Sequence, residues 1–94
     1  MTARAERLSE ILQRELAPIR LQVTDDSARH AGHAGASPQG QTHYSVLVVA
    51  AAFRDRSRVE RARQVHALLA AEFADGMHAL GLRLLTPEEA ERSV

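Results

Sequence analysis

One nearly continuous apolar run, residues 44–53 (YSVLVVAAAF), limits most strongly how this chain can fold. A run of this length, rich in β-branched residues, predicts a central strand that is covered on both faces. Because 94 residues leave room for only one small domain, the other elements must pack around this strand.

Two weaker patterns predict the remaining strands. Residues 19–23 alternate between apolar and polar, and residues 77–85 (MHALGLRLL) place His78 on one face with Leu80, Leu82 and Leu84. No helical pattern separates the first strand from the central one, so we expect that pair to be antiparallel. A helix separates the central strand from the third, which makes that pair parallel if both lie in one sheet.

Helical periodicity predicts three helices. The first runs from about Ala3 to Pro18, with the apolar stripe Leu8, Ile11, Leu12, Leu16 and Ile19. The second begins at Ser57, which has capping-box spacing to Glu60, and ends near Gly76; its stripe is Val59, Ala62, Val65, Leu69 and Phe73. A short third helix begins at Thr86, Pro87 and Glu89. The order helix–strand–strand–helix–strand–helix predicts a single α+β domain over residues 1–94, with helices on one face of a three-stranded mixed sheet.

The segment between the first two predicted strands, residues 25–41, has no hydrophobic periodicity. It is built from Asp, Ser, Ala, His, Gly, Pro and Gln, and it contains His30 and His33. A loop this long in a small domain is more often functional than incidental, so it is the first candidate for a site. Asp25 and Asp26 at its start are expected to organise the turn rather than to form a catalytic pair.

Composition excludes several classes of function. The chain has no cysteine, which excludes a thiolate nucleophile, a CxxC redox pair and an iron–sulfur cluster held by this chain alone. No secretory signal or membrane-length apolar stretch is visible, so we expect a cytoplasmic protein with no membrane partner. Zero net charge and only three aromatic residues argue against a generic nucleic-acid binder. No arrangement typical of a catalyst is found, and no enzymatic activity is predicted.

The chain resembles the BolA family over nearly its whole length. The resemblance is carried by Asp26-Ser27, His30-Ala31-Gly32-His33, Gly40-Gln41-Thr42-His43-Tyr44, Phe53 with Ser57, Arg61 and Arg63, Gly76-Met77-His78-Ala79-Leu80 and Thr86-Pro87-Glu88-Glu89. It implies a KH-like fold of the second topological type, which has the element order already predicted from the residues. It also implies a heterodimer with a monothiol glutaredoxin that shares a 2Fe-2S cluster in iron handling or cluster delivery. Some members of the family are described as DNA-binding regulators.

The resemblance assigns roles to the histidines. It implies that His78 is an iron ligand and that His30 is the second, with His33 as the alternative in the same loop. His43 is expected to have a structural or hydrogen-bonding role beside the site, and His66 to be a solvated helix residue. The thiolate ligands would come from the glutaredoxin and a bound glutathione, so the isolated chain is expected to hold no cofactor tightly. The free form is expected to be a monomer or a weak dimer.

Two departures from the family pattern are visible. Ala62 stands where the family usually has histidine between two arginines, and Asp55 stands where it usually has glycine after Phe53-Arg54. The first leaves in doubt any contact that this histidine makes in relatives.

Other interpretations remain open from the sequence. A zinc site built from His30, His33, His43 and His78 competes with the cluster, although the spacing matches no zinc motif. Residues 54–63 carry an excess of three positive charges and the C-terminal part a matching negative excess. Arg61 and Arg63 therefore either contact a partner or the glutathione carboxylates, or lie on a solvated helix face. The same basic helix, around Arg54–Arg63, supports the alternative function of a DNA-binding transcriptional regulator.

Overall fold

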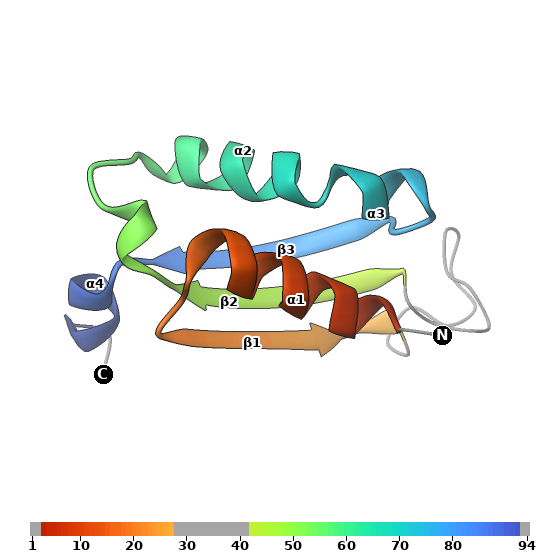
Figure 1. Ribbon diagram of the computed structural model, residues 1–94, viewed down its shortest axis with the longest axis horizontal. Helices are drawn as coiled ribbons and strands as arrows, with labels where there is room; N and C mark the ends of the chain where they lie inside the picture. The colour runs from red at the N-terminus through yellow and green to blue at the C-terminus, as the bar shows by residue number, and fades with distance from the viewer. Residues whose placement is uncertain (1–2, 28–41, 93–94) are drawn as a thin grey trace.

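The computed structural model describes residues 3–27 and 42–92, in which helices cover one face of a three-stranded sheet (Figure 1). The elements in chain order are α1 (Arg4–Leu16), β1 (Arg20–Asp25), β2 (His43–Val49), the 3-10 turn η2 (Ala51–Phe53), α2 (Arg58–Leu68), α3 (Ala70–Ala74), β3 (Ala79–Leu85) and α4 (Pro87–Arg92). This confirms the predicted α+β class and element order.

The sheet is mixed, as predicted, and its strand order is β1-β2-β3. β1 runs antiparallel to β2, with Asp25 opposite Tyr44, and β2 runs parallel to β3, with His43 opposite Ala79. The start of β2, the start of β3 and the end of β1 therefore lie at the same edge of the sheet. β1 ends and β2 begins at this edge, so the described residues on either side of residues 28–41 lie close together.

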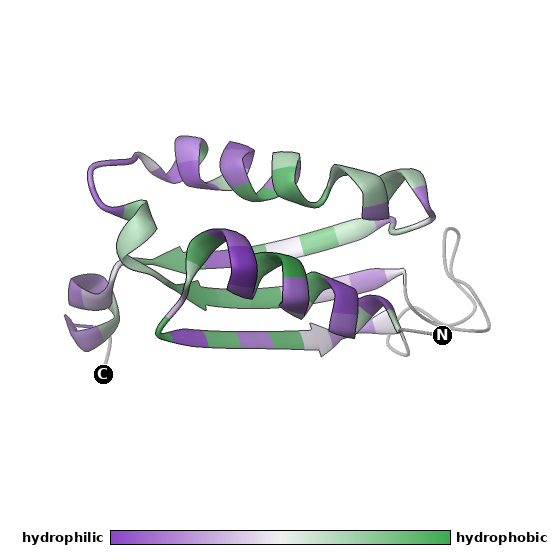
Figure 2. Ribbon diagram, in the orientation of Figure 1, coloured by the Kyte–Doolittle hydropathy of each residue, from purple (hydrophilic) through white to green (hydrophobic). Residues whose placement is uncertain are grey.

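The core lies between the helices and the covered face of the sheet. Alternation along β1 is visible in Figure 2, where hydrophobic and hydrophilic residues take turns along the strand. The buried residues of the core cluster are Leu8, Leu12, Leu16, Tyr44, Val46, Val48, Ala50, Phe53, Val65, Leu69 and Met77. β1 and β3 contribute partly buried residues that pack against this cluster, namely Leu21, Val23, Leu80, Leu82 and Leu84. Helices and sheet thus form the two layers of the domain.

The prediction that the apolar run forms a strand covered on both faces is wrong. β2 ends at Val49, and residues 51–53 turn away as η2. Val49 is buried at the end of β2, but along the rest of the strand Tyr44, Val46 and Val48 are buried beneath the helices, whereas Ser45 is exposed on the other face (Figure 1). Strand alternation accounts for this pattern, because only every second residue of the run can face the helices.

Two apolar residues assigned to the helical stripes lie outside the core. Ile19 is 72% exposed and Val59 is 58% exposed. α1 ends at Leu16, with Ala17 in the left-handed conformation (φ 45°), so Ile19 follows the turn and precedes β1. Val59 lies in the first turn of α2, beyond the covered face of the sheet.

The predicted caps are present. The Glu60 amide donates to Ser57 Oγ (3.1 Å) and the Ser57 amide donates to Glu60 Oε1 (2.8 Å), so both halves of the capping box form. Gly76 closes α3 with a φ of 120°, a conformation that glycine adopts without steric cost. The helical segment after Ser57 is interrupted at Leu69, which divides the single predicted helix into α2 and α3.

The departure at Asp55 has a backbone explanation. Asp55 has a φ of 62°, in the left-handed region that favours glycine. The family's usual glycine suits that conformation, and aspartate is among the non-glycine residues that occupy it most readily. The turn between η2 and α2 therefore keeps its shape without the glycine.

Arg61 is an internal residue, and the prediction that it contacts a partner from the surface is wrong. It is 7% exposed, and its guanidinium lies 5.9 Å from the centre of the Phe53 ring. Its Nε donates to the Arg56 carbonyl (3.0 Å), and its Nη1 donates to the Leu84 carbonyl (3.1 Å) and to Glu89 Oε1 (2.6 Å). These bonds join α2 to the end of β3 and to α4, so the side chain is enclosed by the contacts that hold the fold together.

We expect Glu89 to make stability depend on acid pH. The Arg61 guanidinium, helped by the Thr86 amide, lowers the pKa of Glu89 to about 2 from its ordinary value of 4.5. A carboxylate whose pKa falls on folding stabilises the fold fully above the unfolded pKa and loses that contribution as the pH falls from 4.5 to about 2. In urea unfolding across this window, Glu89→Gln should flatten the loss of stability. Glu91→Gln, on the same helix, should leave the slope as it is; equal slopes for Glu89→Gln and the parent chain would contradict the assignment.

Candidate functional site

The two histidines that begin the parallel strands meet at one edge of the sheet. His78 lies just before β3, rather than within a strand as predicted, and it is exposed. Its amide donates to the Thr42 carbonyl (2.7 Å), which also accepts from the Ala79 amide (3.1 Å). The backbone of the last loop residue before β2 is thereby fixed to the first residues of the parallel neighbour.

The rings of His43 and His78 lie side by side at this edge. Their centres are 6.1 Å apart and their planes differ by 22°. His43 is half-buried, and its Nδ1 lies 2.8 Å from Thr42 Oγ1, within hydrogen-bond distance. The hydrogen bond gives His43 the structural role predicted for it, but its proximity to His78 was not predicted.

A buried serine ties the two ends of the loop together. Ser27 Oγ accepts hydrogen bonds from the Thr42 amide (2.9 Å) and the His43 amide (3.1 Å). Both Ser27 and Thr42 are buried, so these bonds are shielded from water. We call this arrangement the Ser27 latch. It brings the two ends of the histidine-containing segment to the position where His43 and His78 lie.

The two aspartates organise the turn, as expected. Asp25 Oδ1 accepts from the Ser27 amide (2.8 Å), which is the local bond typical of an Asx turn. The Asp26 amide donates to the His43 carbonyl (2.8 Å), and the Asp26 carboxylate accepts from the Ser45 hydroxyl. Both carboxylates are engaged in holding the start of the segment in place.

An ion-pair cluster, missed in the sequence, lies behind the turn that precedes His78. It joins the first two turns of α1 to α3 and consists of Arg4, Arg7, Glu72 and Asp75. Arg7 donates to both carboxylate oxygens of Glu72 at 3.0 Å, and this pairing lowers the pKa of Glu72 and raises the pKa of Arg7. Opposite charges more than 60 positions apart carry no pattern that sequence inspection detects.

The structure does not bring the other predicted histidines to the position of His43 and His78 among the residues that it describes. His30 and His33 lie outside the described residues. His66 is exposed on α2, as expected, with its ring stacked on that of Phe73 at 5.3 Å. Within residues 3–27 and 42–92, no three His, Cys, Asp or Glu side chains are close enough together to hold a metal ion.

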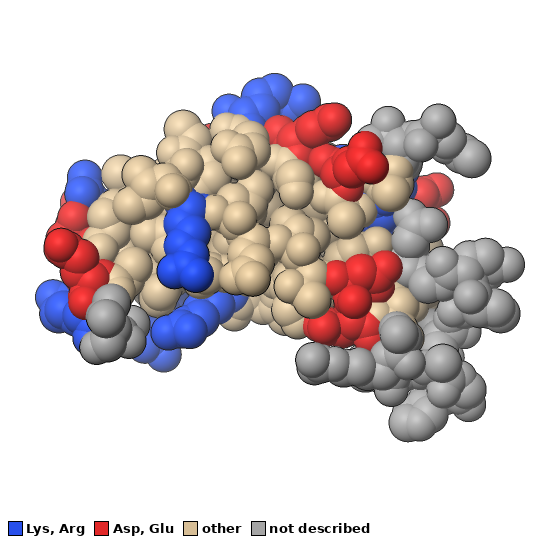
Figure 3. Space-filling view, turned by 90° about the horizontal axis from the view of Figure 1, so that it is seen from below, with Lys and Arg blue, Asp and Glu red and all other residues tan. Residues whose placement is uncertain are grey.

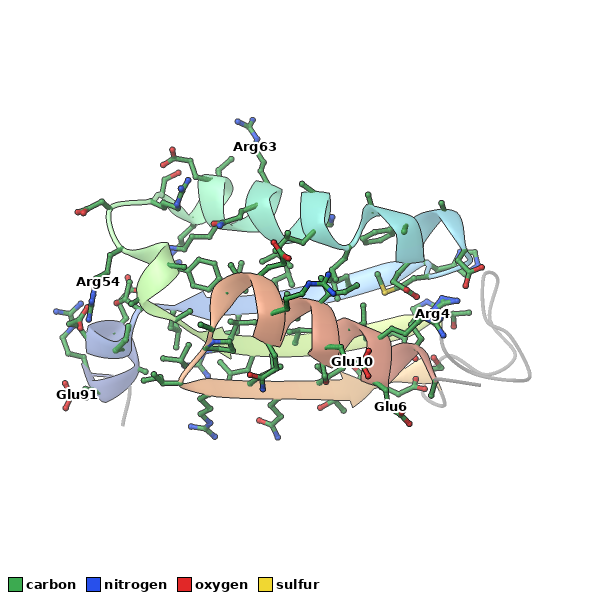
Figure 4. The ribbon with its side chains drawn as sticks, in the orientation of Figure 1. Arg4, Glu6, Glu10, Arg54, Arg63 and Glu91 are labelled. Carbon is green, nitrogen blue, oxygen red and sulfur yellow. The ribbon has the colours of Figure 1, made fainter. Side chains whose placement is uncertain are left out.

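The predicted charge polarity is largely neutralised by the fold. Arg54 pairs with Glu88 through two hydrogen bonds, of which the Nε bond is 2.9 Å, and Arg61 pairs with Glu89. Figure 3 shows basic and acidic side chains next to one another at the end of the molecule where α4 lies. Arg63 extends from the outer side of α2, away from the sheet (Figure 4). Of the predicted pair of contact arginines, only Arg63 is therefore exposed.

Comparison with known proteins identifies the family to which this fold belongs. Residues 12–89 match the family described as BolA-like protein, and the chain belongs to the BolA family. It is 41% identical to SufE-like protein 1 of Arabidopsis thaliana, called chloroplastic/mitochondrial in its name, and 42% identical to BOLA1 of the same plant, called chloroplastic, in each case over 93% of this chain. It spans only 24% and 56%, respectively, of the length of those two relatives. It is also 30% identical, over 87% of this chain and 76% of the relative, to a Haemophilus influenzae protein named DNA-binding transcriptional regulator BolA.

A solved structure agrees with the fold. The BolA domain of SufE1 from Arabidopsis thaliana superposes with a TM-score of 0.85, at 39% identity, over 95% of this chain and 98% of that one. None of the helices in the described part of the chain is long and apolar enough to cross a membrane.

We expect the Ser27 latch to protect the amides of Thr42 and His43 from hydrogen exchange. In Ser27→Ala the amides of Thr42 and His43 lose their acceptor, which should cost about 1–3 kcal/mol of unfolding free energy. Amide hydrogen exchange should accelerate at these two positions and stay slow at Val46 and Val48, in the middle of β2. Unchanged exchange at Thr42 and His43 would show that the latch does not protect the ends of the segment.

Proposed function

We propose that this chain is a non-catalytic adaptor that pairs with a monothiol glutaredoxin and supplies imidazole ligands to a shared 2Fe-2S cluster, in cluster trafficking or iron homeostasis. One observation carries the proposal: in a BolA-family chain without cysteine, the exposed His78 lies at the edge where both ends of the segment with His30 and His33 are fixed. Such a chain can offer half of a ligand set and must obtain thiolates elsewhere.

The proposed ligands are His78 and His30, with His33 as the alternative to His30. Imidazole nitrogen is a good ligand for iron, and a cluster with two histidines and two thiolates is known chemistry. The donor at this edge fits such a half-site, because the exposed imidazole of His78 is open to a partner. The thiolates would come from the glutaredoxin cysteine and glutathione.

The chain's own residues fix the backbone on both sides of the proposed ligands. The Thr42 carbonyl holds the His78 backbone, and the Ser27 latch holds both ends of the loop segment. His43 packs beside His78 as a neighbour and is not proposed as a ligand. Arg63 is the exposed cation proposed to meet the partner or a glutathione carboxylate, a role that the buried Arg61 does not share.

The compartment and the assembly state stay predictions. The sequence predicts the cytoplasm, whereas one plant relative is called chloroplastic/mitochondrial and another chloroplastic in their names. The free chain is expected to be a monomer or a weak dimer.

A second candidate function, a DNA-binding regulator, is favoured by the name of the Haemophilus influenzae relative. On this chain the basic segment offers Arg56, Arg58 and Arg63 as exposed arginines, while Arg61 is buried and Arg54 is paired. Duplex DNA affinity should then fall steeply with salt and fall further in Arg58→Gln/Arg63→Gln, because phosphate contacts release counterions. No binding to duplex DNA at 50 mM salt would reject this candidate.

We expect His78→Ala to abolish the shared cluster. Titration of the parent chain into a cluster-loaded monothiol glutaredoxin should change the visible absorption and circular dichroism and saturate near one to one. The His78→Ala variant should leave the glutaredoxin spectrum as it was, because the iron loses an imidazole ligand. His66→Ala is the matched control, since His66 is also an exposed histidine but lies on α2. A parent-like spectrum in His78→Ala would reject His78 as a ligand.

A further inference from the structure

We propose that the first two turns of α1 position the His78 imidazole, with Arg4 and Arg7 acting as positioning residues through Glu72 and Asp75. The expected effect on cluster binding rests on the proposed function. The positioning itself is a property of the isolated chain. Figure 4 shows Arg4 on the side of the molecule toward the α3–β3 turn, opposite to the end where Arg54 and Glu91 lie.

The cluster holds the turn on its α3 side. Arg4 Nη2 donates to the Asp75 carbonyl and to Asp75 Oδ2, both at 3.2 Å. Arg4 Nε lies 3.4 Å from Glu72 Oε1, and Arg7 donates two hydrogen bonds to the same carboxylate. Asp75 is thus held by side chain and backbone, one residue before Gly76.

The same glutamate also holds the turn through its backbone. The Glu72 carbonyl accepts from the Met77 amide (3.0 Å), and the Met77 side chain is buried in the core. Gly76, between these two fixed residues, has a φ of 120°, and a Cβ added there would lie 3.7 Å from Arg4 Nη2. The Arg4 guanidinium therefore lies next to the glycine of the turn.

His78 follows Met77 immediately, so the turn determines where its side chain begins. One neighbour, Met77, is tied to α3, and the His78 amide is tied to the Thr42 carbonyl at 2.7 Å. The pairing with β2 fixes the backbone from Ala79 onward. The ion-pair cluster holds the other end of the turn, at Asp75, where the backbone is not paired with the sheet.

The position of Arg4 in the helix supports a role outside the helix. α1 begins after Ala3 without a side-chain cap, and Arg4 occupies the first turn, where the helix dipole favours negative charge. A buried guanidinium at this place works against the helix locally. Its partners are Glu72 and Asp75 rather than groups of its own helix, and in some proteins a buried ion pair fixes one arrangement of the chain rather than adding stability.

The test compares Glu72→Gln with Glu89→Gln in the full-length chain. Both changes neutralise a glutamate paired with a buried arginine, but Glu89 lies at the α4 end and Glu72 lies behind His78. The first readout needs no cluster: nuclear Overhauser contacts between the ring protons of His43 and His78, whose centres are 6.1 Å apart. The second is the affinity for the cluster-loaded glutaredoxin, measured by circular dichroism.

We expect Glu72→Gln to lose the contacts between the two rings and to bind about 10-fold more weakly, the loss typical when a residue that orients a metal ligand is removed. Glu89→Gln should keep both. Arg4→Lys, a milder change that keeps the charge but loses the guanidinium geometry, should weaken the ring contacts while the chain stays folded.

Ring contacts that persist in Glu72→Gln and Arg4→Lys would overturn the positioning role, whatever the cluster does. So would an equal loss of affinity in Glu89→Gln, because the effect would then follow stability rather than the turn. If the parent chain changes no glutaredoxin spectrum while Glu72→Gln still loses the ring contacts, the proposed function fails and the positioning role stands.

Discussion

The parallel pairing of β2 with β3 is the constraint on which the rest of this structure depends. Two parallel strands need a crossover, and α2 with α3 provides it across one face of the sheet. The pairing brings the starts of both strands to one edge, and the antiparallel β1 ends there too. Residues widely separated in the chain, among them His43 and His78, become neighbours through this pairing and not through any local motif.

Ion pairs that involve buried arginines hold the helices in place at both ends of the sheet. At one end Arg61 ties α2 to β3 and α4, and at the other Arg4 and Arg7 tie α1 to α3. Arg4 and Arg61 each also donate to a backbone carbonyl. The planar guanidinium, with five donors in a fixed fork, suits such combined contacts better than a lysine ammonium does. A 94-residue chain without disulfides has a small core, and these contacts fix helix ends that the core does not reach.

Periodicity and caps were enough to predict the element order, because these signals are local. The Ser57–Glu60 and Thr86–Glu89 boxes formed as expected, and the mixed sheet followed from which strands a helix separates. Burial was harder to predict, since Ile19 and Val59 belong to apolar stripes and yet lie beyond the layer that they were expected to join. The same limit applies to the site: His78 was recognisable by resemblance, but the burial of Arg61 and the Arg7–Glu72 pair depend on tertiary contacts.

The Ser27 latch separates the fold from the segment that it encloses. Ser27 and Thr42 close the ends of that segment with a buried hydrogen bond between residues that lie outside it. The entropic cost of a longer closed segment grows only slowly, by about 0.6 kcal/mol for each doubling of its length. A longer segment between Ser27 and Thr42 would therefore cost the fold little entropy, so descendants of this domain can differ in the length of the segment while they inherit the same sheet.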